Sequence, residues 1–187
     1  ALYQAIDIEA IKKKVMRGLS EPAGIITFPG VNGYTKELDK RLPYDVDAAK
    51  KLLADAGYPK GFDVELRCPN DRYVNDEAIC TAVVGMLGKI GVNVNLFAQT
   101  KSKHFKELKE DKGDFYMLGW GVPTLDSHYV FHYLYESGAS WNKVNFSNSE
   151  VDAAIRVMEG EVDLDKRNAA IANAWKIVKD DISYLPL

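Results

Sequence analysis

Hydrophobic positions along this 187-residue chain follow two periods, and each period predicts a different kind of element. Apolar side chains recur three and four residues apart in seven segments, which is the spacing of one helix face. These segments predict helices at Ala5–Leu19, Asp45–Ala56, Val74–Ile90, Lys103–Glu110, Ser127–Tyr135, Asn148–Glu159 and Asp163–Lys179. Apolar and polar residues alternate instead in Phe62–Cys68 and Val92–Ala98, which predicts two half-buried strands. Phe115–Leu118 is bulky throughout, so we expect a third strand at the centre of the sheet.

Residues that cap helices support these boundaries. Asp7 and Asp45 are each placed to accept a backbone N–H at a helix start. Gly57 is suited to the left-handed conformation that ends a helix before Pro59. The expected inner faces carry Ala49, Leu52, Leu53 and Ala56 in one helix and Ile171, Ala174, Trp175 and Val178 in the last.

The order of the elements predicts the fold class. Strand, helix, strand, helix and strand in sequence produce a parallel sheet with helices packed on its faces, joined by right-handed crossovers. We therefore expect an α/β fold with a mostly parallel sheet, a helical C-terminal quarter and an extended segment at Ile182–Leu187. Residues 1–187 fit a single lobe. The segment Ser20–Pro43 is a long loop, and loops of that length in a compact domain usually have a function or wrap another part of the molecule.

Composition and charge exclude several classes of partner. The chain is 47% hydrophobic and 27% charged, which is typical of a globular protein, and its net charge of −3 carries no basic stripe for nucleic acid. No apolar run approaches the ~20 residues of a membrane-spanning helix. The two cysteines, Cys68 and Cys80, are too few for a four-cysteine zinc site, and they leave open a disulfide in an oxidising compartment or two packed free thiols.

Known catalytic motifs are missing from the chain. It contains neither a phosphate-binding P-loop nor a G-x-S-x-G nucleophile elbow, and the segment Gly119–Gly121 lacks the third glycine of a dinucleotide site. We therefore predict a protein that is not an enzyme and that holds no cofactor.

The pair His128 and His132 leaves a second interpretation open. The two histidines lie four residues apart on a predicted helix, with Asp126 before them and Glu136 after. Tyr129 stands where a metalloprotease helix has glutamate, and a zinc site would need a third ligand. Two partly buried histidines on an aromatic helix are the ordinary interpretation, and the alternative is a metal- or haem-binding module.

The loop after the third strand is the first candidate for ligand binding. Ligands of open α/β sheets bind beyond the carboxyl ends of the strands, and Trp120 follows such an end. Trp120 offers an apolar wall with one N–H donor, and Gly121 and Val122 bring backbone close to a ligand. Asp126 would either contact the ligand or cap the next helix.

Two further loops carry candidate residues. Asn70, Arg72 and Tyr73 follow the first strand, and an arginine there is suited to a carboxylate. Trp141 and Asn142 lie among small residues and amides before the helix at 148–159. The ordinary alternatives are a solvated arginine in the first loop and a surface turn in the second.

Several segments together resemble one protein family. Tyr44–Phe62 follows the pattern Tyr-Asp-x-x-x-Ala-Lys-x-Leu-Leu-x-x-Ala-Gly-Tyr-Pro-x-Gly-Phe. Ala5–Ile11, Gly113–Trp120, Asn145–Asp152 and Tyr184–Leu187 match further blocks of the same family. The chain resembles the extracytoplasmic solute-binding proteins of peptide-type ABC importers, known as bacterial extracellular solute-binding proteins of family 5, across essentially its whole length.

The resemblance implies a function, a location and partners. Members of that family have two lobes that close on a solute, so this chain is expected to be the second lobe. The full protein would capture a peptide or other small solute in the periplasm, or at the cell surface by a lipid anchor, and deliver it to an ABC permease. Peptide binders of the family usually carry Asp three residues after the tryptophan, where this chain has Pro123, and Ser127 replaces a proline. The usual anchor for a peptide amino group is therefore absent.

Overall fold

The computed structural model describes residues 1–187 and divides them into two compact units. Unit 1 comprises residues 1–22 and 42–119, and unit 2 comprises residues 23–41 and 120–187. The sequence analysis expected residues 1–187 to form a single lobe. Whether the two units together make up that lobe stays a prediction.

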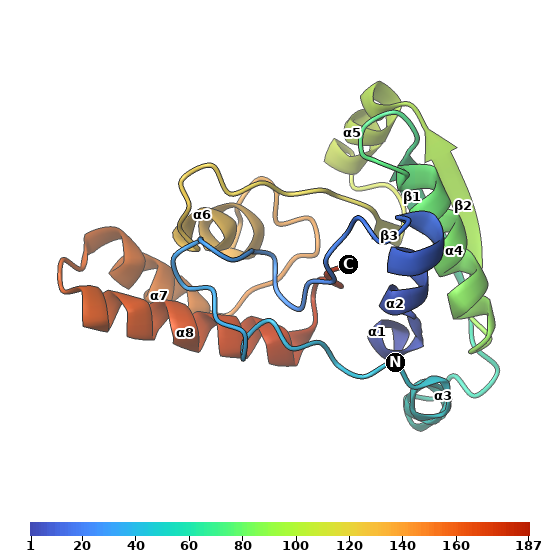
Figure 1. Cartoon of the computed structure of the whole chain (residues 1–187), viewed down its shortest axis with the longest axis horizontal. Helices are drawn as coiled ribbons and strands as arrows, with labels where there is room; N and C mark the ends of the chain where they lie inside the picture. Colours follow the sequence, from blue (N-terminus) through green and yellow to red (C-terminus); the bar gives the residue numbers. More distant parts are fainter. The chain divides into compact units, whose positions relative to one another are not determined.

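Unit 1 contains a three-stranded parallel sheet, as the element order predicted (Figure 1). Strands β1 (Asp63–Pro69), β2 (Asn93–Gln99) and β3 (Phe115–Tyr116) lie in the order β2-β1-β3. The prediction that the third strand is central is wrong, because β3 pairs over only two residues at the edge and β1 lies between its neighbours. Leu66 of β1 shows this central position, because it is paired with Leu96 of β2 and with Phe115 of β3 and is buried.

Helices flank this sheet. Helix α4 (Asp76–Gly88) packs on β1 and β2, and α5 (Lys101–Lys109) packs on β1. Helix α4 begins two residues later than the spacing predicted, because Asn75 has a positive φ and leaves Val74 exposed. The fold class is α/β with a parallel sheet, as expected.

Three short helical pieces stand where one helix was predicted at Ala5–Leu19, and the first of them ends at the first residue of that range. These are α1 (Leu2–Ala5), α2 (Ile8–Ala10) and the π-helical turn η1 (Ile11–Val15). The predicted cap explains the division, because Asp7 accepts the N–H of Ala10 at 2.9 Å and so starts a new helix after an extended residue.

Helix α3 (Val46–Asp55) begins and ends as predicted, with Asp45 accepting the N–H of Ala48 at 2.8 Å. Its buried face is narrower than the apolar pattern indicated. Ala49 and Leu53 are buried and α1 packs on the helix, whereas Leu52 and Ala56 are exposed.

Unit 2 combines the long loop with the C-terminal helices. Residues 23–41 form no helix or strand, yet they pair with the later chain through the bridge between Asn32 and Asp126. The helical elements are α6 (His128–Val130), the π-helical turn η2 (Phe131–Tyr135), α7 (Ser149–Gly160) and α8 (Leu164–Asp181). The predicted inner face of α8 is confirmed, since Ile171, Ala174, Trp175 and Val178 are buried.

The expected extended segment 182–187 is irregular. No helix reaches the length and apolarity needed to cross a bilayer.

Candidate functional site

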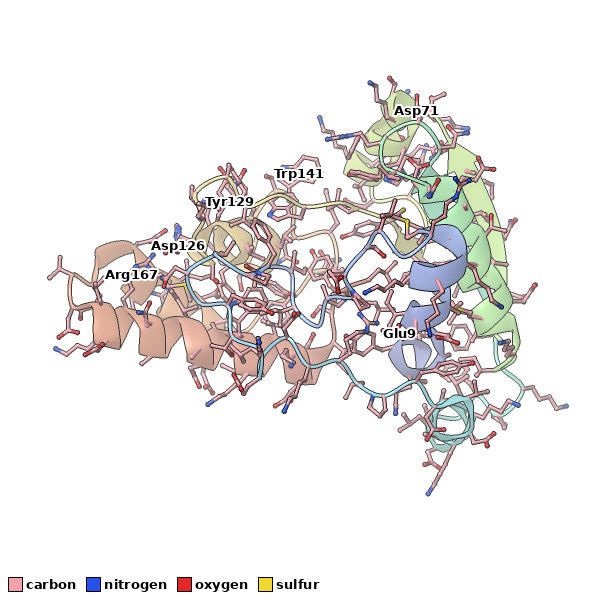
Figure 2. All side chains as sticks on the ribbon, in the orientation of Figure 1. Glu9, Asp71, Asp126, Tyr129, Trp141 and Arg167 are labelled. Atoms are coloured by element: carbon pink, nitrogen blue, oxygen red, sulfur yellow. The ribbon has the colours of Figure 1, made fainter.

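Four aromatic side chains gather in unit 2 and form what we call the aromatic cluster: Trp120, Tyr129, Tyr133 and Trp141. The ring centroid of Trp120 lies 6.0 Å from the centroid of each of the other three rings. Tyr129 and Tyr133 lie one helical turn apart with their rings tilted by 52° and their centroids separated by 4.8 Å. All four side chains are partly exposed, so the cluster presents aromatic surface to solvent; Figure 2 shows Tyr129 and Trp141 near α6.

The loop that carries Trp120 is held by its neighbours in sequence. Val122 is buried, which anchors the loop, while a Cβ added to Gly121 would meet no atom within 4 Å. The indole Nε1 of Trp120 is buried and has no hydrogen-bond partner within the chain. Buried tryptophan N–H groups usually have a partner, so this donor without one distinguishes Trp120 from an ordinary core tryptophan.

Asp126 has a structural role in the chain. Its carboxylate accepts two hydrogen bonds from Arg167, at 2.8 and 2.9 Å, one from the Asn32 amide at 3.0 Å and one from the His128 N–H at 2.9 Å. Burial alone would raise the pKa of Asp126, but these hydrogen bonds and the charge of Arg167 outweigh burial and hold the pKa below its usual range. The carboxylate therefore stays charged and positions the loop, and Figure 2 shows Asp126 and Arg167 close together.

Ser127 links the same loop to the core. Its hydroxyl donates to the Asn32 carbonyl at 2.6 Å and accepts the indole N–H of Trp175 at 3.1 Å. Ser127 is fully buried. Its hydroxyl thus joins residues 23–41 to helix α8.

Asn142 also serves the fold. Its side chain is buried and makes hydrogen bonds to the backbone of Glu136 and Phe146, three in all, at 2.7 to 3.0 Å. These bonds close the turn that presents Trp141 to the aromatic cluster. Asn142 is thus a positioning residue, and Trp141 is the member of this pair that offers surface.

The predicted residues Asn70, Arg72 and Tyr73 belong to unit 1. Asn70 and Arg72 are exposed, and the Arg72 guanidinium lies over the Tyr73 ring at 4.9 Å from its centroid. The Tyr73 hydroxyl donates to the Gly119 carbonyl at 3.3 Å, and a Cβ at Gly119 would lie 2.5 Å from the Tyr73 ring. Tyr73 therefore packs against the residue directly before Trp120.

Asp76 holds this first loop, and the sequence pattern gave no indication of it. The buried carboxylate accepts the N–H groups of Arg72 and Tyr73, both at 3.0 Å, and that of Glu77 at 2.9 Å. Burial alone would raise the pKa of Asp76, but the backbone hydrogen bonds outweigh it and lower the pKa.

The structure thus brings together Trp120 and Trp141 and adds Tyr129 and Tyr133, which the sequence analysis missed. The four-residue spacing of these tyrosines beside two tryptophans was a signal that could have identified them. Arg167 and Asp76 gave no such signal, because their partners are defined only by contacts that form on folding.

A family model matches this chain. The model for bacterial extracellular solute-binding proteins, family 5 (middle part), matches residues 1–142, which is more than half of the chain. The chain is 28% identical over 195 residues to heme-binding protein A of Haemophilus influenzae, covering 100% of this chain and 35% of that protein. The chain spans about a third of the length of the curated relatives that it matches.

Solved structures show the same fold. The ABC transporter-associated periplasmic binding protein DppA of Helicobacter pylori, in complex with the peptide STSA, superimposes with a TM-score of 0.91 at 21% identity, covering 100% of this chain and 36% of that one. A dipeptide-binding protein of Pseudoalteromonas sp. SM9913, in complex with Met-Leu, gives a TM-score of 0.88 at 27% identity, covering 99% and 38%.

Proposed function

Because the chain belongs to family 5 of the bacterial extracellular solute-binding proteins, we propose that it forms the second, solute-binding lobe of an ABC importer component. The full-length protein captures a small solute outside the cytoplasmic membrane, in the periplasm or at the surface on a lipid anchor. It then delivers that solute to a membrane permease. Family members bind solutes and are not enzymes, in agreement with the expectation from the sequence.

The aromatic cluster is the observation that carries this proposal. Trp120 and the three partly exposed rings whose centroids lie 6.0 Å from its own form an apolar wall, beside an indole N–H without a partner in the chain. Ligand sites are typically apolar surfaces with a small number of placed polar groups, and binding to them needs stacking and hydrogen bonds without covalent chemistry.

The charges near the cluster bear on the solute class. Pro123 offers no charge, and the oxygens of Asp126 already accept hydrogen bonds from Arg167, Asn32 and His128. A solute with a free amino group would find no available carboxylate in this loop. The names of the relatives include haem-, dipeptide- and glutathione-binding proteins, so family membership alone leaves the solute open. We propose a peptide-like or other small solute bound mainly by a flat or apolar group.

Truncation of Trp120 tests the proposal in the full-length protein. The solute that co-purifies is first identified by mass spectrometry after denaturation, and its affinity is then measured by calorimetry. Trp120→Ala should weaken binding at least about tenfold, because one aromatic contact contributes about 0.5–1.5 kcal/mol beyond its buried area. Tyr58→Ala is the control, since Tyr58 is an exposed aromatic residue of unit 1 that pairs with Phe62. Unchanged affinity in Trp120→Ala, or no bound solute, would contradict the proposal.

The haem alternative has less support from the geometry. His128 and His132 stack on one side of a single helical segment, with ring centroids 5.6 Å apart. Two axial ligands of one haem approach the iron from opposite faces of the porphyrin, which stacked neighbours on one helix cannot do. The histidine pair suits a bare metal ion better.

A further inference from the structure

Three side chains with metal-ligating atoms gather in unit 2, and none of them belongs to the aromatic cluster. They are His128 in α6, His132 in η2 and Glu159 near the end of α7, and their ligand atoms lie within 4.8 Å of one another. His128 Nε2 is 3.4 Å from Glu159 Oε1, and His132 Nδ1 is 4.0 Å from the same oxygen. We infer that these residues form a binding site for a divalent transition-metal ion.

The donor set selects the class of ion. Two imidazoles and one carboxylate are the protein ligands of many zinc sites that leave a fourth position to water. Mg²⁺ and Ca²⁺ prefer oxygen ligands throughout, whereas imidazole favours ions such as Zn²⁺ and Ni²⁺. The third ligand that the sequence did not provide lies 31 residues from His128 and 27 from His132, on another helix.

Small side-chain movements are enough to close the site. Ligands at about 2.1 Å from a tetrahedral ion lie about 3.4 Å apart, so the widest separation here must shorten by about 1.4 Å. The side chains are 29% exposed for His128, 42% for His132 and 46% for Glu159, so none is locked by close packing. The pair His128 and Glu159 already has the required spacing.

The backbone that carries the ligands is fixed by one arginine. Arg167 Nε donates to the Met158 carbonyl at 2.8 Å, next to Glu159, and the rest of the guanidinium binds Asp126. Asp126 in turn accepts the N–H of His128. One side chain therefore holds the histidine segment and the glutamate segment in register before any ion arrives, which lowers the cost of binding.

Glu136 supports the orientation of one ligand. Its carboxylate oxygen lies 2.8 Å from His132 Nδ1. A carboxylate beside the non-ligating nitrogen of a metal-bound imidazole fixes the orientation of the ring and makes it a stronger ligand, so with Glu136 beside Nδ1 the nitrogen of His132 that binds the ion would be Nε2. We assign Glu136 as a positioning residue, whose removal should weaken binding less than removal of a ligand.

The site does not depend on the proposed solute function. Two faces of one helical segment carry the two sets of residues. One face presents Tyr129 and Tyr133 to Trp120. The neighbouring face presents His128 and His132 to Glu159. Loss of the solute site would therefore leave the metal site intact, and the reverse also holds.

Metal titration of the untagged full chain tests the inference. Calorimetry and equilibrium dialysis with Zn²⁺ and with Ni²⁺ should give one ion per chain, and Co²⁺ should show the visible absorption of a low-symmetry nitrogen and oxygen site. The double variant His128→Ala, His132→Ala should lose at least about a hundredfold in affinity, and Glu159→Gln at least about tenfold. Glu150→Gln is the matched control, because Glu150 is an exposed acid of the same helix outside the site, and it should bind as the parent does.

Circular dichroism checks that each variant folds. If the double variant does not fold, Glu159→Gln decides the question, because its partly exposed carboxylate is replaced by a side chain of the same shape. Binding of less than one ion per chain, or equal affinity in Glu159→Gln and Glu150→Gln, would overturn the inference.

Discussion

At the scale of single residues, the fold depends on a few positions where no alternative side chain fits. Gly33 is one of them, because its φ is +91° and a Cβ there would lie 2.4 Å from Ile171 Cγ2 and 2.5 Å from Ser127 Oγ. Those two neighbours are buried, and Ser127 carries the hydrogen bonds to Asn32 and Trp175. Gly33 therefore lets residues 23–41 approach helix α8.

Gly33→Ala should destabilise the chain much more than Gly30→Ala. Both glycines have positive φ, so both variants lose about 1 kcal/mol to backbone strain, but a Cβ at Gly30 meets nothing within 4 Å. The clash at Gly33 should cost at least about 2 kcal/mol more. Urea unfolding measures the difference, and equal midpoints for the two variants would show that the contact at Ser127 is not needed.

At the scale of elements, the first strand and the next helix are joined by a loop that one carboxylate organises. Asp76 is the first residue of α4 and accepts three backbone N–H groups, two of them from Arg72 and Tyr73. The loop has no helix or strand of its own, so its conformation depends on these bonds. The same loop positions Tyr73 against Gly119.

Asp76→Asn should loosen this loop. The NH2 group of asparagine is a donor, and it cannot accept the backbone N–H groups that the Asp76 carboxylate accepts. Hydrogen bonds to charged groups contribute about 1.5–3 kcal/mol, so a loss of about 2 kcal/mol in unfolding free energy is expected. Hydrogen exchange at the amides of Arg72 and Tyr73 should become faster. Glu77→Gln, in the same helical turn but exposed, should change stability by less than about 0.5 kcal/mol. Unchanged exchange in Asp76→Asn would contradict this account.

At the scale of the whole molecule, folding shifts the pKa values of groups in both units, so stability depends on pH. His104 in unit 1 is buried, and burial lowers its pKa despite the hydrogen bond of Nε2 to the Met117 carbonyl at 2.9 Å. Its Nδ1 is buried without a partner, so a charged imidazole would carry a second N–H that is buried without an acceptor. The pKa values of Asp126 and Asp76 are also lowered, as described above.

The sign of the effect follows from these directions. A group whose pKa is lower in the folded chain stabilises the fold above its unfolded pKa, and this contribution is lost as pH falls toward the folded pKa. Stability should therefore decline below about pH 6.5, through His104, at no more than about 1.4 kcal/mol per pH unit. A second decline should begin below about pH 4, as Asp126 and Asp76 take up protons.

Urea unfolding across this pH range tests the prediction. The chain has three histidines, so the double variant His128→Ala, His132→Ala leaves His104 alone and should keep the decline between about pH 6.5 and pH 5. Stability that is constant over that range in the double variant would show that His104 does not resist protonation in the folded chain.

Much of the secondary structure could be predicted from the sequence, because local spacing determines it. The caps Asp7 and Asp45 and the buried face of α8 are where the pattern placed them. The hydrophobic pattern does not show which segments pack on a helix or strand, so it predicts burial less well than it predicts the element itself. It placed β3 at the centre of the sheet and buried Leu52, and the structure contradicts both.

The candidate sites divide in the same way. Trp120 was chosen as a candidate from its place after a strand, because strand ends and glycines are visible in a sequence. The pairing of Asp126 with Arg167 and of His128 with Glu159 was not visible, because these partners lie 41 and 31 residues apart. Pairs so distant in sequence become partners only when the chain folds.

The sequence by itself determined the helices and strands, the parallel order of the sheet and the family, since periodicity, capping and local motifs are properties of neighbouring residues. Only the tertiary structure decided which strand is central, which carboxylates are already occupied and which histidines have a third ligand. The physical reason is that burial and long-range hydrogen bonds depend on distances between segments, and a linear pattern does not contain those distances.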